Sequence, residues 1–237
     1  MRIIPINEAI ILAGGLGTRL RSALPELPKC MAPVNNKPFI FYVNDYLQQQ
    51  GIQHFIFALG YKNEYFLHEL SKSLPASSYT ISIEDEPLGT GGAVQLALSK
   101  CRTENVLLTN GDTLFKFNLA ALSNMHIAKK AACTLSLKYM ENFERYGVVV
   151  MDDANCINSF QEKKYYKNGL INGGVYALNI PAFKEKITET KFSFEKDYLE
   201  KFYTEKRFFG LKEDGYFIDI GIPEDYLKAQ TDFIHEF

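Results

Sequence analysis

The sequence predicts an α/β protein, a Rossmann-like three-layer sandwich with a mostly parallel central sheet. Residues 53–59 and 105–109 form nearly continuous apolar runs, as buried strands of a parallel sheet do. Helical apolar spacing lies between and after these runs, and the short apolar strand 8–11 leads into a glycine-rich turn. Strands that alternate with helices in this way are typical of an open sheet with helices on both faces.

The helices are predicted from apolar spacing and from residues that begin or end helices. Gly51 ends one helix, Asn118 is an N-cap for another, and Pro223 occupies the first position of the last. The predicted helices cover residues 39–50, 62–70, 92–100, 118–130 and 223–237.

After residue 131 the pattern changes to short β-rich segments that follow one another closely. They cover residues 132–139, 147–151, 157–160 and 170–178. Segments this close together favour antiparallel pairing, so we expect a mixed or antiparallel extension of the sheet. No stretch has the composition of a linker, and we interpret residues 1–237 as a single domain.

Composition excludes several classes of protein. The formal net charge is −2, and the lysines and arginines are scattered, so nothing predicts nucleic-acid binding. The first residues carry one arginine and a short apolar run before Gly14, which predicts neither a signal peptide nor a membrane span. The four cysteines are far apart and lack a C-x-x-C spacing, so we expect reduced thiols in a cytoplasmic protein.

The glycine-rich turn is the most informative segment. Residues 12–20 read L-A-G-G-L-G-T-R-L, and glycines after a buried strand let backbone N–H groups approach phosphate oxygens. Arg19 adds a charged donor, and Lys29 places a second cation nearby. Together they predict that a nucleoside triphosphate binds here.

Two familiar phosphate-binding loops do not fit. A P-loop needs Gly-Lys followed by Ser or Thr, and no such triplet follows the turn. A dinucleotide fingerprint needs a third glycine, and Leu20 stands in its place. An NAD-dependent enzyme is therefore not expected.

Two aspartates are predicted at the same edge of the sheet. Asp112 follows the strand 105–109, and Asp219 lies in F-I-D-I-G, where a short strand gives way to glycine. Mg²⁺ binds proteins through one or two carboxylates together with phosphate oxygens. An aspartate after glycine is commonly a turn or N-cap residue, but an acid between two isoleucines needs a partner.

A third cluster follows the segment 157–160. Glu162 and Lys163 are an adjacent acid and base, able to bind sugar hydroxyls and a phosphate, and Asn172 precedes a pair of glycines. Read alone, Glu-Lys-Lys is typical of a solvated turn, and the two glycines are compatible with a strand bulge.

Seven ordered motifs resemble the sugar-1-phosphate nucleotidylyltransferases from residue 8 to about 230. They are G-G-L-G-T-R-L, P-K at 28–29, P-L-G-T-G-G-A at 87–93, N-G-D at 110–112, E-K at 162–163, N-G-G-V-Y at 172–176 and D-I-G-I-P at 219–223. The segments 27–34, 87–93 and 169–176 are most similar to D-glycero-α-D-manno-heptose 1-phosphate guanylyltransferases of capsule and surface-glycan pathways. Cys30 departs from the family, in which proline commonly follows the lysine.

The resemblance implies a nucleotide-diphospho-sugar transferase fold and a reaction in which the sugar phosphate attacks the α-phosphorus of the nucleotide and pyrophosphate leaves. Residues 1–130 would form the nucleotide-binding part and 131–237 the sugar-phosphate and metal part. The implied catalytic residues are Arg19, Lys29 and Lys163, and Asp112 and Asp219 would bind Mg²⁺. The implied nucleotide-binding residues are Leu12, Ala13, Gly14, Gly15, Gly17, Thr18, Glu84, Gly89 and Thr90. The implied sugar-binding residues are Asn110, Gly147, Glu162 and Asn172.

The base is predicted from Glu84, which ends the expected strand 79–83. Its two oxygens can accept hydrogen bonds from two N–H groups of guanine, whereas uracil or thymine offers one donor. This favours GTP, although Asp85 and Glu86 are neighbouring acids that compete for the same role.

Other activities stay open at this point. The chain could be a mannose-1-phosphate guanylyltransferase or another sugar-1-phosphate uridylyl- or thymidylyltransferase, because these enzymes share most of the reaction with a heptose 1-phosphate guanylyltransferase. A catalytically inactive regulatory relative would lose charged groups that are present here. A glycosyltransferase would ordinarily show an Asp-x-Asp motif, which the chain lacks. A homodimer is common in the family.

Overall fold

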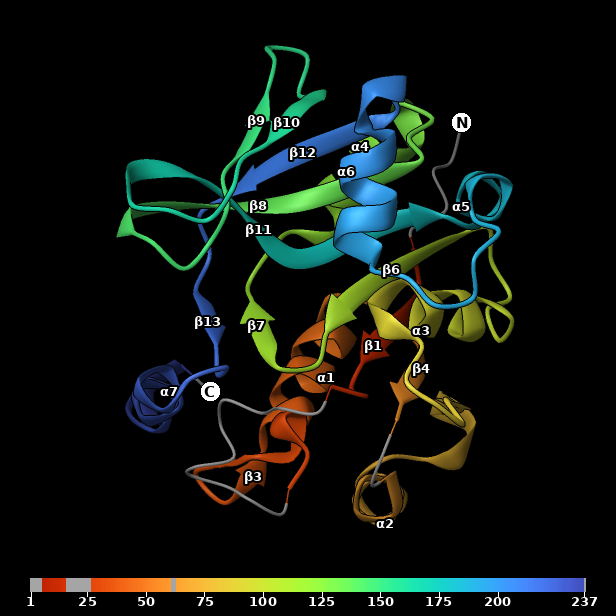
Figure 1. The fold of residues 1–237 in the computed structure, drawn as a ribbon. Helices are drawn as coiled ribbons and strands as arrows, with labels where there is room; N and C mark the ends of the chain where they lie inside the picture. The colour runs from red at the N-terminus through yellow and green to blue at the C-terminus, as the bar shows by residue number, and fades with distance from the viewer. Residues whose placement is uncertain (1–5, 16–26, 61–62, 237) are drawn as a thin grey trace.

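The computed structural model describes residues 6–15, 27–60 and 63–236, and it confirms the predicted α/β sandwich (Figure 1). In this part of the chain a seven-stranded sheet has the order β12-β8-β11-β6-β1-β4-β5. Because β11 pairs antiparallel with both β6 and β8, it runs against the other six strands. The strands are β1 (Glu8–Leu12), β4 (His54–Leu59), β5 (Tyr79–Ile83), β6 (Asn105–Asn110), β8 (Cys133–Phe143), β11 (Tyr166–Asn179) and β12 (Phe208–Glu213).

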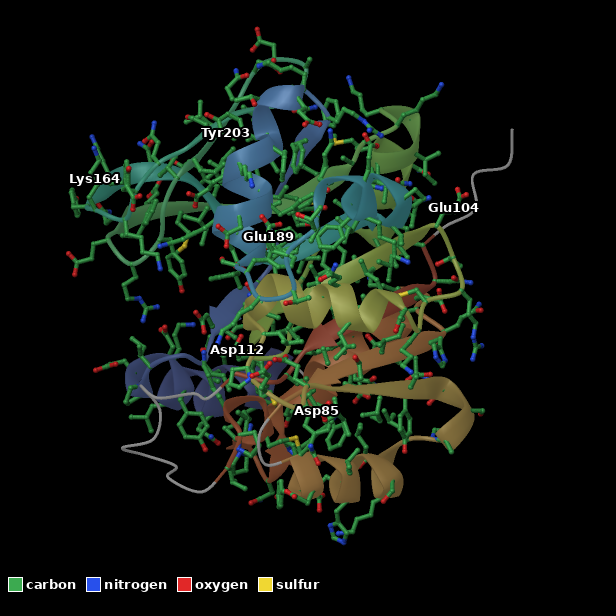
Figure 2. The ribbon with its side chains drawn as sticks, turned by 45° about the vertical axis from the view of Figure 1, so that its right-hand side comes forward. Asp85, Glu104, Asp112, Lys164, Glu189 and Tyr203 are labelled. Atoms are coloured by element: carbon green, nitrogen blue, oxygen red, sulfur yellow. The ribbon has the colours of Figure 1, made fainter. Side chains whose placement is uncertain are left out.

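The β-rich extension is partly a separate unit. β9 (Val149–Met151) and β10 (Ile157–Phe160) pair with each other in a two-stranded sheet and do not widen the central one. Lys164, between β10 and β11, lies at the outer end of this extension (Figure 2). The predicted strands are therefore confirmed as mixed and antiparallel, but they divide between two sheets.

Helices cover both faces of the central sheet. The layer on one face contains α1 (Phe39–Gln49), α2 (Asn63–Ser73), α4 (Leu119–Ala128) and α7 (Pro223–Glu236). The layer on the other contains α3 (Gly89–Leu98), α5 (Ile180–Lys186) and a π-helical turn, Phe194–Leu199, which continues into α6 (Glu200–Phe202). Sequence reasoning missed α5, the π-turn, α6 and β12.

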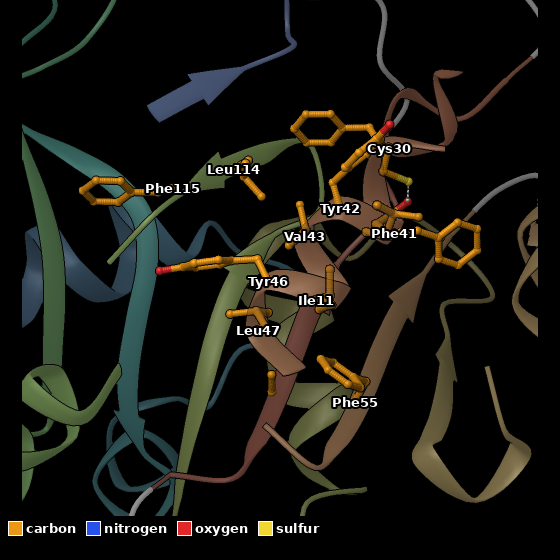
Figure 3. Packing of buried hydrophobic residues seen from close by; sticks show 14 of the residues in the cluster. Ile11, Cys30, Phe41, Tyr42, Val43, Tyr46, Leu47, Phe55, Leu114 and Phe115 are labelled. Atoms are coloured by element: carbon orange, nitrogen blue, oxygen red, sulfur yellow. Dashed lines mark hydrogen bonds between the residues drawn. The ribbon is translucent and has the colours of Figure 1, made fainter. Parts of the chain in front are cut away.

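Side-chain alternation along the strands explains the two layers. Ile11 of β1 packs with Phe55 of β4 in one apolar cluster, whereas Ile10 and Ile56 belong to the cluster on the opposite face. Successive residues of a strand point to opposite faces, so strands that are apolar throughout build two cores. Figure 3 shows the first of these cores, in which α1 packs over β1 and β4.

The predicted starts at Asn118 and Pro223 are confirmed, but the helix predicted over 92–100 is Gly89–Leu98, and the one predicted over 62–70 continues to Ser73. The side chain of Asn118 accepts a hydrogen bond from the Ala121 N–H (3.0 Å), and α7 begins at Pro223. No helix among the described residues is long and apolar enough to cross a membrane.

Small elements at the edge of the main sheet position the site. They are the 3₁₀ turn Lys29–Met31, the paired strands β2 (Pro33–Val34) and β3 (Lys37–Pro38), and β7 (Thr113–Phe115), which pairs antiparallel with β13 (Phe217–Asp219). Two further 3₁₀ turns, Ala76–Ser78 and Tyr203–Glu205, connect larger elements.

Candidate functional site

Two cavities meet at the carboxyl ends of β1 and β6, the edge at which open α/β sheets bind ligands. The first cavity has a volume of about 400 Å³ and the second about 450 Å³. Five of the described residues line both: Asn110, Tyr146, Lys163, Glu195 and Asp219. The first cavity is otherwise lined mainly by Leu12, Ala13, Gly15, Lys29, Thr90, Asp112, Arg145 and Gly221, and the second mainly by Gly147, Glu162, Asn172, Gly173, Tyr176, Ser193, Lys196 and Glu200.

The ammonium group of Lys29 lies between two carboxylates. Its Nζ is 2.6 Å from Asp112 Oδ2 and 3.1 Å from Asp219 Oδ1. Burial by itself would lower the pKa of Lys29, but the charges of Asp112 and Asp219 outweigh this and raise it. The lysine is therefore charged at neutral pH, and both aspartates face the same point in the cleft.

Strand pairing brings these aspartates together. Asp219 of β13 lies opposite Thr113 of β7, and the Ile220 N–H donates to the Asp112 carbonyl (3.1 Å). Asp112, labelled in Figure 2, lines the first cavity. The predicted metal-binding pair is thus adjacent in the structure, although its members come from distant parts of the chain.

Gly221 leaves room for the charged cluster. A Cβ atom at this position would lie 2.8 Å from Asp219 Oδ1 and 2.8 Å from Lys29 Nζ. The Gly221 N–H also donates to Asp219 Oδ1 (2.8 Å). The backbone of this residue therefore helps to aim the carboxylate.

Among the described residues, two cations besides Lys29 line the first cavity. Lys163 lines both cavities, and Arg145 lines the first, where its guanidinium donates to Asp225 and to the hydroxyl of Tyr146. Burial, supported by the charge of Asp219, raises the pKa of Tyr146 to about 12. Tyr146 therefore stays a neutral hydroxyl beside the charged cluster.

The described part of the glycine-rich turn lies where the sequence predicts it. Leu12, Ala13 and Gly15 line the first cavity. Gly14 packs on the backbone of Gly60, where a Cβ would lie 2.9 Å from the Gly60 nitrogen. Gly17, Thr18 and Arg19, three of the predicted nucleotide-binding and catalytic residues, lie outside the described residues.

The predicted base-binding residues surround the start of α3. Glu84 Oε2 accepts a hydrogen bond from the Leu88 N–H (2.8 Å), and a Cβ on Gly14 would lie 3.4 Å from Glu84 Oε1. Glu84 therefore lies against the glycine-rich turn, with one oxygen already hydrogen-bonded. Gly89 begins α3 with a positive φ of 75°, and Thr90 lines the first cavity.

The predicted sugar-binding residues all line the second cavity. Asn110, Gly147, Glu162 and Asn172 meet there. Asn172 is also held locally, since its Nδ2 donates to the Tyr176 hydroxyl (2.8 Å) and its Oδ1 accepts from the Gly174 N–H (3.0 Å).

Sequence reasoning missed four charged residues among those described that line the cavities: Arg145, Glu195, Lys196 and Glu200. For Arg145 the sequence offers only a weak signal, its position two residues before Gly147, a predicted sugar-binding residue. Glu195 follows Ser193, whose side chain accepts the Lys196 N–H as an N-cap (3.2 Å). The Ser-x-Glu spacing resembles the start of a helix, but nothing local shows that this turn lies against the cleft.

Comparison with known proteins agrees with this geometry. The family model described as nucleotidyl transferase matches residues 8–236. The chain belongs to the nucleotidyl transferase family. The heptose branch to which its motifs are similar is also represented among its relatives.

Two curated relatives match this nucleotidyl transferase over nearly their whole length. A D-glycero-α-D-manno-heptose 1-phosphate guanylyltransferase of Aneurinibacillus thermoaerophilus is 51% identical over 228 residues, which cover 96% of this chain and 99% of the relative. A D-glycero-α-D-manno-heptose 1-phosphate guanylyltransferase of Campylobacter jejuni is 43% identical over 219 residues, which cover 92% of this chain and 96% of the relative. A mannose-1-phosphate guanyltransferase of Schizosaccharomyces pombe is 34% identical, and the match spans 63% of its length.

Solved structures confirm the nucleotidyl transferase fold. HddC of Yersinia pseudotuberculosis, in a complex with GMP-PN, superposes with a TM-score of 0.87 at 37% identity, covering 96% of this chain and all of that one. A solved structure from Bacillus anthracis shares the fold with a TM-score of 0.79 at 20% identity.

Proposed function

We propose that this nucleotidyl transferase transfers GMP from GTP to D-glycero-α-D-manno-heptose 1-phosphate, giving GDP-heptose and pyrophosphate. The observation that carries the chemistry is the Lys29 ammonium between Asp112 and Asp219, where the two cavities meet. The choice of heptose and guanine is supported by two relatives that are 51% and 43% identical to this chain over nearly the whole length of both proteins.

The reaction needs positioning and charge neutralisation rather than a covalent enzyme intermediate. A phosphate oxygen of the sugar phosphate attacks the α-phosphorus of GTP, the bond from that phosphorus to the bridging oxygen breaks, and pyrophosphate leaves with the electron pair. Lys29 neutralises the α-phosphate, and Lys163 orients the attacking phosphate from the boundary of the two cavities. Arg19, which lies outside the described residues, would hold the departing pyrophosphate.

The two aspartates fit a magnesium ion. Both can supply carboxylate oxygens as metal ligands, and each accepts a hydrogen bond from the Lys29 ammonium. Among the described residues no group of three or more His, Cys, Asp or Glu side chains could hold a metal, so Mg²⁺ would also use phosphate oxygens and water here. When bound, the ion would neutralise charge on the phosphates.

The site divides the two substrates between its cavities. We infer that GTP binds in the first cavity along Leu12, Ala13 and Gly15, and that the sugar binds in the second against Glu162 and Asn172. Glu84 lies beside this nucleotide site, and its Oε1 is the oxygen left for a guanine N–H.

We infer a cytoplasmic location because the reaction consumes GTP. All four cysteines are free thiols, and burial raises the pKa of Cys30 and Cys133 well above the ordinary value. Thiols that stay reduced are typical of a reducing compartment.

The direct test is pyrophosphate release with Mg²⁺, in which four nucleoside triphosphates are scanned against a panel of sugar 1-phosphates that includes the manno-heptose. We expect GTP with the heptose to be the productive pair. A different productive pair would keep the mechanism and correct the substrate. No release from any pair, with nucleotide binding intact, would contradict the proposal and favour a regulatory relative.

A further inference from the structure

Glu195 lines both cavities, yet the proposed chemistry gives it no role. Its neighbours Ser193, Lys196 and Glu200 line the second cavity only. The segment 193–200 therefore forms part of the wall of the second cavity, and Glu195 lies where the second cavity meets the first.

Two hydroxyl groups hold one oxygen of this carboxylate. Glu195 Oε2 accepts hydrogen bonds from Thr90 Oγ1 (2.7 Å) and Ser193 Oγ (3.1 Å). Thr90 Oγ1 accepts the Phe194 N–H (2.9 Å), and Ser193 Oγ accepts the Lys196 N–H. Since a hydroxyl donates only one proton, both protons are directed to Oε2. Within the described part of the chain, Oε1 accepts no hydrogen bond.

The backbone around Glu195 is fixed to the start of α3. The Gly91 N–H donates to the Phe192 carbonyl (2.9 Å), and the Phe192 N–H donates to the Leu88 carbonyl (3.0 Å). The contact is so close that a Cβ on Gly91 would lie 2.1 Å from the Phe192 ring. The π-helical turn that follows is a geometry found frequently at functional sites. Glu195 is thus preorganised rather than a free surface acid.

The surroundings of Glu195 indicate what it binds. Phosphate oxygens and a carboxylate repel each other, whereas sugar hydroxyls donate hydrogen bonds to one. Tyr176 and Asn172 line the second cavity, and Phe194 packs edge-on against the Tyr176 ring at 5.1 Å. Glu195 and Tyr176 line the same cavity; burial raises the pKa of Tyr176, and the charge of Glu195 raises it further.

We propose that Glu195 is a specificity-determining residue, which accepts a hydrogen bond on Oε1 from a hydroxyl group of the sugar 1-phosphate. Thr90 is then a positioning residue that aims the carboxylate. The inference rests on the proposed function for the class of substrate. The ribose of the nucleotide carries the same hydroxyl chemistry, but it would approach from the first cavity.

Steady-state kinetics of Glu195→Ala with both substrates varied tests the assignment. A hydrogen bond to a charged group contributes enough that we expect KM for the sugar 1-phosphate to rise about 10- to 100-fold, with KM for GTP within about twofold of the wild-type value. Glu185→Gln, an exposed acid of α5 whose contact is Lys186, is the matched control. A rise in KM for GTP alone would assign Glu195 to the ribose and overturn the proposal, as would no change in either KM.

The positioning role of Thr90 has its own test. Thr90→Ser keeps the hydroxyl, and we expect it to preserve the KM for the sugar 1-phosphate. Thr90→Val removes the donor to Glu195, and we expect this KM to rise in the same direction as in Glu195→Ala. Equal KM values for the serine and valine variants would overturn the positioning role.

Calorimetric titration with heptose 1-phosphate, in the absence of GTP, separates this inference from the proposed function. Weaker binding by Glu195→Ala than by the wild type supports the inference without any turnover. Equal binding overturns it. Absence of turnover by the wild-type protein with the whole substrate panel overturns the proposed function alone.

Discussion

Thr113 of β7 lies opposite Asp219 of β13 in an antiparallel ladder, and this pairing places the carboxylates of Asp112 and Asp219 on one lysine. The two strands are three residues each and separate from the central sheet. Since Asp112 follows the end of β6, the small ladder joins the parallel sheet to the C-terminal part of the chain. The charged centre of the site is therefore built by a long-range pairing.

Replacing Lys29 by Met tests this centre. Loss of one preorganised cation costs roughly 10²- to 10³-fold in turnover, and we expect kcat to fall by this amount. The variant also leaves two carboxylates close together without their shared cation, so Mg²⁺ should raise its melting temperature more than that of the wild type. Turnover and thermal unfolding with and without Mg²⁺ are the measurements.

Lys72→Met is the matched control, because Lys72 forms an exposed ion pair with Glu69 and lines neither cavity. Exposed ion pairs contribute little, so its turnover and its response to Mg²⁺ should equal those of the wild type. An equal response to Mg²⁺ in Lys29→Met would contradict the assignment of the two aspartates as metal ligands.

Gly221→Ala tests the close approach at the centre of the site. The new Cβ would meet the ends of two flexible side chains, Asp219 and Lys29, and not the backbone. We expect the melting temperature to change little, because these ends can move aside. Since the displaced atoms are the reactive ones, turnover should fall about 10- to 100-fold. A large loss of stability with turnover unchanged in the folded fraction would refute this account.

Much of the fold and several site residues were predictable from local patterns. Apolar runs identify β4 and β6 because both faces of these strands are buried, and Asn118 and Pro223 mark helix starts by their own chemistry. The expected position of Asp112 agrees with the structure, in which it lines the first cavity, because the end of a parallel strand fixes where the next residues lie.

The residues that were missed depend on contacts distant in the chain. Glu195 reaches the cleft only because its segment is hydrogen-bonded to the start of α3, and no local pattern encodes that contact. The expectation for Glu84 treated both oxygens alike, whereas Oε2 already accepts a hydrogen bond from the Leu88 N–H. Long-range hydrogen bonds therefore decide the details that residue type and spacing leave open.

Glu84→Gln tests the choice of base. The amide keeps one acceptor oxygen but replaces the other with a donor, which faces the N–H groups of guanine unfavourably. We expect the ratio of kcat/KM for GTP to that for UTP to fall. Asp85→Asn and Glu86→Gln are neighbouring controls that should leave the ratio unchanged. An unchanged ratio in Glu84→Gln would remove this residue from base selection.

His126 makes stability depend on pH, away from the site. His126 is a residue of α4, and its buried ring contacts the central sheet, where Nδ1 meets Thr134 Oγ1 of β8 (2.9 Å) and Nε2 meets Asn105 Oδ1 of β6 (3.1 Å). Burial lowers its pKa from 6.5 to about 4. As the pH falls below 6.5 the unfolded chain takes up a proton that the folded protein refuses until about pH 4, so the free energy of unfolding decreases across this window. The shift corresponds to a loss of about 3 kcal/mol.

Chemical denaturation of the wild type and His126→Gln at several pH values between 7 and 4 measures this contribution. The variant should be less stable near pH 7, because it loses the buried hydrogen bonds, but its stability should fall less steeply toward pH 4. His68→Gln changes an exposed histidine of α2 and should keep the slope of the wild type. Parallel slopes for the wild type and His126→Gln would mean that the imidazole of the folded protein titrates with its ordinary pKa. The loss of stability between pH 7 and pH 4 would then have to come from protonation of carboxylates.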